Sequence, residues 1–158
     1  MKKLKLYLET TVFNRYFEPD SDNYADTQQL FAEIAAKKFD ACTSQYVVDE
    51  LMDACDPKRT SMINLITQHR IRILQKSGEI EALADEYARQ GMITERHLLD
   101  RQHIACASVH GMDAIISLNF NHINRMKTKR MLPHINQLNG YANIIISVPM
   151  EVTNYEDE

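Results

Sequence analysis

Three carboxylates and one amide stand singly where the pattern of apolar residues indicates that a strand ends or a helix begins. They are Glu9 in LYLETT, Glu50 in TSQYVVDEL, Asp100 in LLDRQHIACA and Asn119 in IISLNF. The chain between them has the periodicity of ordinary amphipathic helices and apolar strands. Isolated acids at element ends are therefore candidates for one shared site. Oxygen donors of this kind suit a hard divalent cation such as Mg²⁺ or Mn²⁺.

Such a cation would hold Glu9, Glu50 and Asp100 together by offsetting the repulsion between their charges. It would also polarise a phosphodiester and lower the pKa of a bound water that attacks phosphorus. The amide of Asn119 could hold a metal-bound water or position the nucleophile without adding charge. We therefore expect all four residues to be catalytic and the three acids to be metal ligands. Taken alone, Glu50 has a plainer interpretation as a solvated acid on a polar helix face.

The elements that must position these residues follow from the apolar pattern. Short apolar runs predict five strands, at residues 3–9, 39–44, 71–74, 113–119 and 143–149. Apolar residues at helical spacing predict helices at 24–38, after Ser44, from Asp56-Pro57, from Ser77 to Gln90, from Thr94 or Leu98 to His110, and a polar helix interrupted near Pro133. Strands that alternate with helices predict a parallel sheet covered on both faces. Ligands bind such sheets beyond the carboxyl ends of the strands, where all four residues could converge.

The composition indicates one soluble domain. A chain of 158 residues with 44% apolar content can build a single core, so we expect one domain over residues 1–150 and an acidic tail at 151–158. No apolar run approaches the roughly 20 residues that span a bilayer, and no signal-peptide pattern follows the basic start. Cys42, Cys55 and Cys106 are odd in number and widely spaced, which favours buried, reduced thiols. The predicted location is therefore the cytoplasm, without a membrane partner.

Other chemistries have weaker support in the sequence. His103 and His110 share a helix face, but the short-spaced soft ligands of a zinc site do not occur. The G-x-S-x-G elbow and the glycine loops of nucleotide-binding proteins are also missing. Basic residues gather at 58–72 and at 125–130, which are either candidate phosphate-binding surfaces or solvated helix faces. The net charge of −4 argues mildly against a general nucleic-acid-binding surface.

Four segments together resemble a known family. YLETTVFNRYF, TSQYVVDEL, DRQHIACASVHGMDAIISLNFNHI and NIIISVPMEV are similar to the PIN-domain family and, within it, to VapC-type toxins. The resemblance implies an α/β/α sandwich, in three layers around a parallel sheet of about five short strands. It also implies a metal-dependent ribonuclease that hydrolyses single-stranded RNA, a small antitoxin as protein partner, and a homodimer as a frequent assembly.

The resemblance can be followed position by position. The acid at the end of the family's first strand matches Glu9, and the family's helix glutamate matches Glu50. The acid that precedes His-Ile-Ala matches Asp100, and the family's fourth site position matches Asn119. The family usually has Asp at the first position and often at the fourth, so a one-metal site or low activity stays open. Arg101 stands where the family commonly has a small residue. The competing interpretation is a PIN-like binding module that no longer cuts. Thr10, Ser44 and His103 are further candidates near the site, with helix capping as the plainer role of Ser44 and packing as that of His103.

Overall fold

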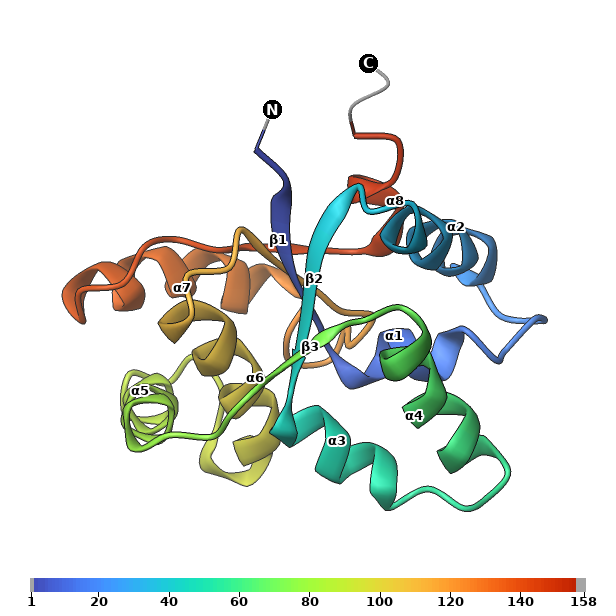
Figure 1. Cartoon of the computed structure of the whole chain (residues 1–158). Helices are drawn as coiled ribbons and strands as arrows, with labels where there is room; N and C mark the ends of the chain where they lie inside the picture. The colour runs from blue at the N-terminus through green and yellow to red at the C-terminus, as the bar shows by residue number, and fades with distance from the viewer. Residues whose placement is uncertain (1, 156–158) are drawn as a thin grey trace.

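The computed structural model describes residues 2–155 of the chain, and its centre is a sheet of parallel strands (Figure 1). The strands are β1 (Leu4–Leu8), β2 (Phe39–Ser44), β3 (Arg72–Leu74), β4 (Ala114–Ile116) and β5 (Ile145–Ser147). They lie in the order β3-β2-β1-β4-β5, so β1 is central and pairs with both β2 and β4. The predicted parallel sheet of five short strands is confirmed.

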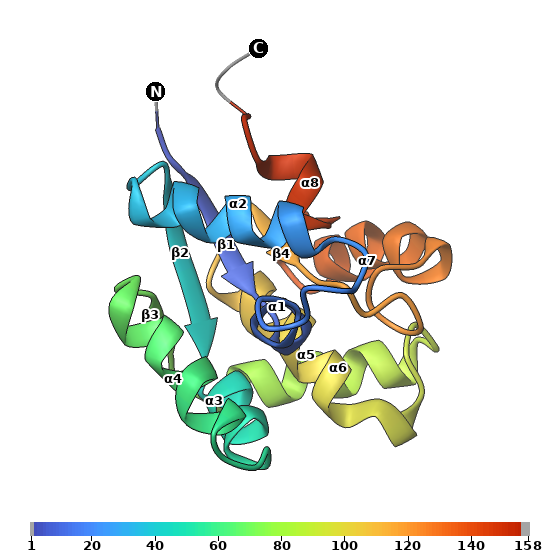
Figure 2. The same ribbon diagram turned by 90° about the vertical axis from the view of Figure 1, so that its right-hand side faces the viewer.

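Helices cover both faces of the sheet. Those described are α1 (Thr10–Arg15), α2 (Tyr24–Ala35), α3 (Gln45–Met52), α4 (Lys58–Gln68), α5 (Gly78–Arg89), a 3₁₀ turn (Glu95–His97), α6 (Leu98–Val109), α7 (Met126–Leu138) and α8 (Pro149–Val152). In Figure 1, α5, α6 and α7 lie on one side of the sheet, and α1, α2, α4 and α8 lie on the other. Figure 2, turned by 90°, shows α2 crossing in front of the strands. The three-layer α/β/α sandwich is confirmed.

Local sequence signals account for several helix starts. The Ser44 hydroxyl accepts a hydrogen bond from the Val47 backbone N–H at 3.3 Å, and Ser77 caps α5 in the same way at 3.2 Å. Helix α4 begins at Lys58, one residue later than expected, although the preceding Asp56 accepts from the Thr60 N–H at 3.1 Å. These caps satisfy backbone donors that the first helical turn leaves without partners.

One helix was missed, and one helical prediction was wrong. Helix α1 was not expected, because its hydroxyl pair and short length gave no periodic signal, yet Val12 and Phe13 are buried in the core. Helix α7 continues through Pro133, although a break was predicted there. Buried Leu132 and Ile135 flank the proline, so packing holds the helix together where a backbone hydrogen bond is lost. The expected burial of the thiols holds for two of the three, since Cys55 is exposed.

The end of the described chain packs against the body of the protein. Helix α8 contacts α2, and the Asn154 backbone N–H donates to the buried Glu33 carboxylate at 3.0 Å. The last three acids of the expected tail, residues 156–158, lie outside the described residues. Between residues 2 and 155, the structure has no helix long and apolar enough to cross a membrane.

Candidate metal centre

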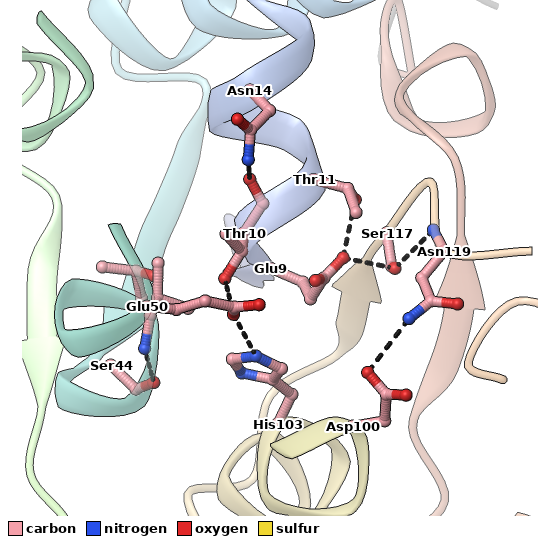
Figure 3. A network of polar contacts seen from close by, with 12 residues as sticks. Glu9, Thr10, Thr11, Asn14, Ser44, Glu50, Asp100, His103, Ser117 and Asn119 are labelled. Carbon is pink, nitrogen blue, oxygen red and sulfur yellow. Dashed lines mark hydrogen bonds and ion pairs between the residues drawn. The ribbon is translucent and has the colours of Figure 1, made fainter. Parts of the chain in front are cut away.

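The four residues expected to form a site come together beyond the carboxyl ends of the strands (Figure 3). Glu9 directly follows β1, and its backbone N–H donates to the Ile116 carbonyl of β4 at 3.1 Å. Glu50 lies in α3, which starts where β2 ends, and Asp100 lies in the first turn of α6. Asn119 lies in the loop after β4. Three separate elements and one loop therefore supply the polar groups.

Two hydroxyls hold the buried carboxylate of Glu9, which is only 2% exposed. The hydroxyls of Thr11 and Ser117 each donate to its Oε1 atom at 2.6 Å. Thr11 also accepts from the Leu118 backbone N–H at 2.8 Å and so fastens the end of β1 to the loop after β4. Burial raises the pKa of Glu9, and neither the two hydroxyls nor the nearby His103 offset this effect. The contacts fix one carboxylate oxygen and leave the second, Oε2, as the candidate ligand.

Glu50 is held by a hydroxyl and an imidazole. Its Oε1 atom accepts hydrogen bonds from the Thr10 hydroxyl and, at 3.1 Å, from Nε2 of His103. Burial alone would raise the pKa of Glu50, but the bonds from His103 and Thr10 outweigh it and lower the pKa. The carboxylate is therefore charged and oriented, as a metal ligand requires.

A buried chain of hydrogen bonds extends from Glu50 into the core. Nδ1 of His103 lies 2.7 Å from the Tyr7 hydroxyl, which lies 2.6 Å from the Ser44 hydroxyl. In the neutral imidazole one nitrogen donates and the other accepts. With Nε2 donating to Glu50, the Tyr7 hydroxyl donates to Nδ1, and Ser44 donates to Tyr7. This chain fixes the tautomer and the ring orientation of His103 and, through them, the position of Glu50.

Replacing Tyr7 with phenylalanine should destabilise the fold by about 1–3 kcal/mol, because it leaves buried groups of His103 and Ser44 without a partner. It should also weaken Mn²⁺ binding by about tenfold or more, the usual cost of losing a group that orients a ligand. Urea unfolding and Mn²⁺ titration measure the two effects. Tyr87→Phe is the matched control, since the Tyr87 hydroxyl is equally buried but bonds to Ser108 and Asn136 away from the site. Equal loss of Mn²⁺ affinity in both variants would contradict the orienting role of Tyr7.

Both carboxylate oxygens of Asp100 have a polar partner. Its Oδ1 accepts from the Asn119 amide at 3.0 Å, and its Oδ2 lies 3.1 Å from Nδ1 of His122. The Asn119 carbonyl oxygen in turn accepts from the His122 backbone N–H at 3.0 Å. Burial raises the pKa of Asp100 against the opposing attraction of His103, His122 and His97. Asn119 thus ties the α6 acid to the loop after β4.

The other residues singled out in the sequence take various places. Thr10 contacts Glu50 as a supporting hydroxyl, and Ser44 both caps α3 and bonds to Tyr7. His103 is buried, and it also contacts the site directly. Arg101 points away from the acids, because its guanidinium donates to backbone carbonyls of Ala84, Thr94 and Glu95.

The structure adds several residues that were not predicted from the sequence. They are Tyr7, Thr11, Ser117, His97 and His122. Tyr7 looked like an ordinary strand residue, and the others are polar residues near element ends. Glu9 and Asn119 were predicted because they lie near element ends. The same criterion could have found Thr11 and Ser117. Nothing in the sequence placed His97 near His122.

The charges of the three acids are not matched by cationic side chains. Among residues 2–155, Glu9, Glu50 and Asp100 form no ion pair with lysine or arginine, and their basic contacts are the imidazoles of His103 and His122. Ligand atoms of Glu9, Glu50 and His103 lie within 4.8 Å of one another. Converging carboxylates without a compensating cation are costly to bury. Glu9 and Glu50 therefore fit a hard divalent cation between them, and Asp100, whose ligand atom groups with His97 and His122, lies beside this pair.

The two basic regions lie in different places. Arg70 lies just before β3 and Arg72 is its first residue, so both lie at the amino edge of the sheet, opposite to the acids. Arg125 has a structural role, because its guanidinium donates to the Thr128 hydroxyl and to the Met92 carbonyl. Exposed basic residues follow it on α7, namely Lys127, Lys129 and Arg130. The α7 surface directly follows the loop that carries Asn119, whereas Lys58 and Arg59 begin α4, which packs against α3.

Comparison with known proteins identifies the fold. The sequence matches no model of a known protein family and no curated protein. The structure is similar to that of VapC20 from Mycobacterium tuberculosis, a toxin that cleaves the sarcin-ricin loop. The TM-score is 0.58 and the identity 13%, over 74% of this chain and 92% of that chain. It is also similar to a chain of VapBC2 from Rickettsia felis, solved with a DNA fragment from its promoter. Here the TM-score is 0.56 and the identity 16%, over 92% and 98% of the two chains.

These likenesses confirm at the level of the fold what the sequence resemblance implied. The chain has the fold of VapC toxins, with its own set of polar residues at the carboxyl edge of the sheet.

Proposed function

We propose that this chain, which has the VapC fold, is a metal-dependent endoribonuclease of the PIN-domain type. Glu9, Glu50 and Asp100 bind Mg²⁺ or Mn²⁺, and Asn119 positions Asp100 and the reacting groups. The observation that carries the proposal is that carboxylates from three elements, without a lysine or arginine partner among the described residues, lie at the edge where parallel sheets bind ligands. The ligand atoms of Glu9 and Glu50 lie within 4.8 Å of each other, and Asp100 lies beside them.

The side chains around the acids have separate tasks in this proposal. Thr11 and Ser117 orient Glu9, while Thr10 and His103 orient Glu50. A bound cation would polarise the scissile phosphate and lower the pKa of a coordinated water. The hydrogen bonds hold the ligand oxygens in place before the substrate arrives, so the site needs little rearrangement.

Single-stranded RNA is the proposed substrate, because attack in line with the leaving group needs an accessible backbone that loops and single strands offer. The fold likeness to a toxin that cleaves the sarcin-ricin loop supports this choice. A small antitoxin is the proposed protein partner and a homodimer the proposed assembly, by analogy with the VapBC2 complex and the family resemblance. The cytoplasm remains the proposed location.

Cleavage of a labelled single-stranded RNA tests the proposal. The metal-free protein should leave the RNA intact, Mg²⁺ or Mn²⁺ should start cleavage, and a duplex of the same sequence should be cut more slowly. No change in melting temperature with millimolar Mg²⁺ or Mn²⁺, together with no cleavage, would instead favour the binding module that the sequence left open.

The α7 surface should act as a phosphate-binding track for the RNA. Replacing Lys127 or Arg130 with glutamine should weaken RNA binding and reduce the dependence of log Kd on log salt by about 0.7 for each lost contact to a single strand. Fluorescence anisotropy at several salt concentrations measures this slope. Lys3→Gln is the matched control, since Lys3 is exposed near the amino edge of the sheet. A slope that changes equally in the control and the α7 variants would contradict the track.

A further inference from the structure

A second group of potential metal ligands lies beside the carboxylate centre. His97, Asp100 and His122 each offer a ligand atom, and these atoms lie within 4.8 Å of one another. His97 ends the 3₁₀ turn before α6, Asp100 lies in the first turn of α6, and His122 lies in the loop between β4 and α7. All three are half-buried, so water and ions can reach them.

The distances suit a shared cation. Nδ1 of His122 and Oδ2 of Asp100 are 3.1 Å apart. For an ion about 2.1 Å from each atom, the usual Zn–N and Zn–O separation, the N–ion–O angle would be roughly 95–100°. This value lies between the octahedral and tetrahedral angles. The His97 and His122 rings stack with centroids 3.7 Å apart and a tilt of 28°, so the second imidazole is adjacent, and a rotation of the His97 ring out of the stack would direct its nitrogen to the same ion.

The group is also supported by a polar side chain behind it. The Asn119 amide donates to Oδ1 of Asp100, and its carbonyl oxygen accepts from the His122 backbone N–H. One side chain therefore fixes both the acid and the loop of the second histidine. Groups that orient ligands in this way are a regular part of metal sites. Asn119 has an amide where an acid would add a further charge, so the nitrogen donors are the distinctive part of this group.

We propose that His97, Asp100 and His122 form a binding site for a borderline divalent transition metal, with Zn²⁺ as the expected ion. Two imidazoles and one carboxylate are the donor set that Zn²⁺, Co²⁺ and Ni²⁺ prefer, whereas Mg²⁺ prefers oxygen ligands alone. Three protein ligands leave at least one position of the ion open to water or to a phosphate. The site goes beyond the proposed nuclease centre and does not depend on it, although Asp100 belongs to both groups. The simpler alternative is a plain hydrogen bond between His122 and Asp100.

Cobalt binding tests this site. The full chain, without a histidine tag and freed of metal, is titrated with Co²⁺ while visible absorption is recorded, and Zn²⁺ is then added as a competitor. We expect one equivalent of Co²⁺ to give the absorption of a nitrogen-ligated ion and Zn²⁺ to displace it. His97→Ala and His122→Ala should each weaken Co²⁺ binding by at least about tenfold, because even groups behind the ligands have effects of that size.

Three further variants separate this site from other sources of binding. His134→Ala removes an exposed histidine of α7 and should leave the titration unchanged. Glu50→Gln, which damages the nuclease centre, should also leave the Co²⁺ absorption in place, so failure of the nuclease proposal and failure of this one give different results. His122→Asn keeps a polar side chain in the loop and serves if His122→Ala does not fold. Unchanged Co²⁺ affinity in folded His97 and His122 variants, or its loss in Glu50→Gln alone, would overturn the proposal.

Discussion

Asp100→Asn should lower metal-dependent RNA cleavage by more than about 100-fold, since replacing groups that merely orient metal ligands already costs 10- to 100-fold. Asparagine has nearly the same shape as aspartate but no charge, so the attraction for the cation is lost while packing is kept. The contact between Oδ1 and the Asn119 amide can persist in the variant. Cleavage rates at saturating Mn²⁺ measure the effect, and circular dichroism verifies the fold.

Asp85→Asn is the control for this experiment. Asp85 is exposed on α5, close to α6, so Asp85→Asn removes the same charge at the surface of the protein. The control should cleave RNA at the rate of the unmodified protein. Full cleavage by a folded Asp100→Asn variant would remove Asp100 from the catalytic site and would turn attention to Glu9, Glu50 and His103 alone.

Glu9→Gln should raise the thermal stability of the metal-free protein and abolish its response to Mn²⁺. Glu9 is a nearly fully buried acid, and burial raises its pKa, which means that its surroundings disfavour the charged form of the carboxyl. Removing that charge should stabilise the fold by about 1–3 kcal/mol, the scale of an imperfectly compensated buried group. At about 2–4 °C for each kcal/mol, the melting temperature should rise measurably.

Glu9→Gln should reduce the stabilisation by metal, although it stabilises the metal-free protein. In the unmodified protein, Mn²⁺ at about 100 times its Kd should add about 2.7 kcal/mol, or about 5–10 °C in melting temperature. Glu9→Gln should lose most of this gain. Glu33→Gln is the matched control, because Glu33 is equally buried but bonds to Gln29 and Asn154 far from the acids. If Mn²⁺ stabilises Glu9→Gln as much as the unmodified protein, Glu9 is not a ligand.

Much of the fold could be predicted because local signals agree with the final structure. The five strands are short apolar runs, and Ser44 and Ser77 cap helices as their spacing indicated. Helix α1 escaped prediction because it is short and is stabilised by burial of Val12 and Phe13 against distant parts of the chain. The uninterrupted α7 escaped for the same reason, since tertiary packing outweighs the effect of Pro133 on the helix.

The candidate site could be predicted only in outline. Glu9, Glu50, Asp100 and Asn119 were found because polar residues at the ends of apolar elements are conspicuous, and the rule for parallel sheets places them at one edge. The hydrogen bonds that hold them depend on side-chain directions that no local pattern encodes. The stacking of His97 on His122 joins a 3₁₀ turn to a remote loop, and only the folded chain brings them into contact.

The contact between Ser117 and Glu9 spans 108 positions of the chain. Strands β1 and β2 are made before β4 and can pair early, whereas β4 and the loop after it leave the ribosome later. Chains are made from the amino end at a limited rate, and distant contacts form only after the intervening residues exist. A polypeptide that ends before Ser117 therefore contains Glu9, Glu50 and Asp100 but lacks Ser117 and Asn119, which hold two of these acids in place. The topology delays the ordering of Glu9 until β4 and the loop after it have been made.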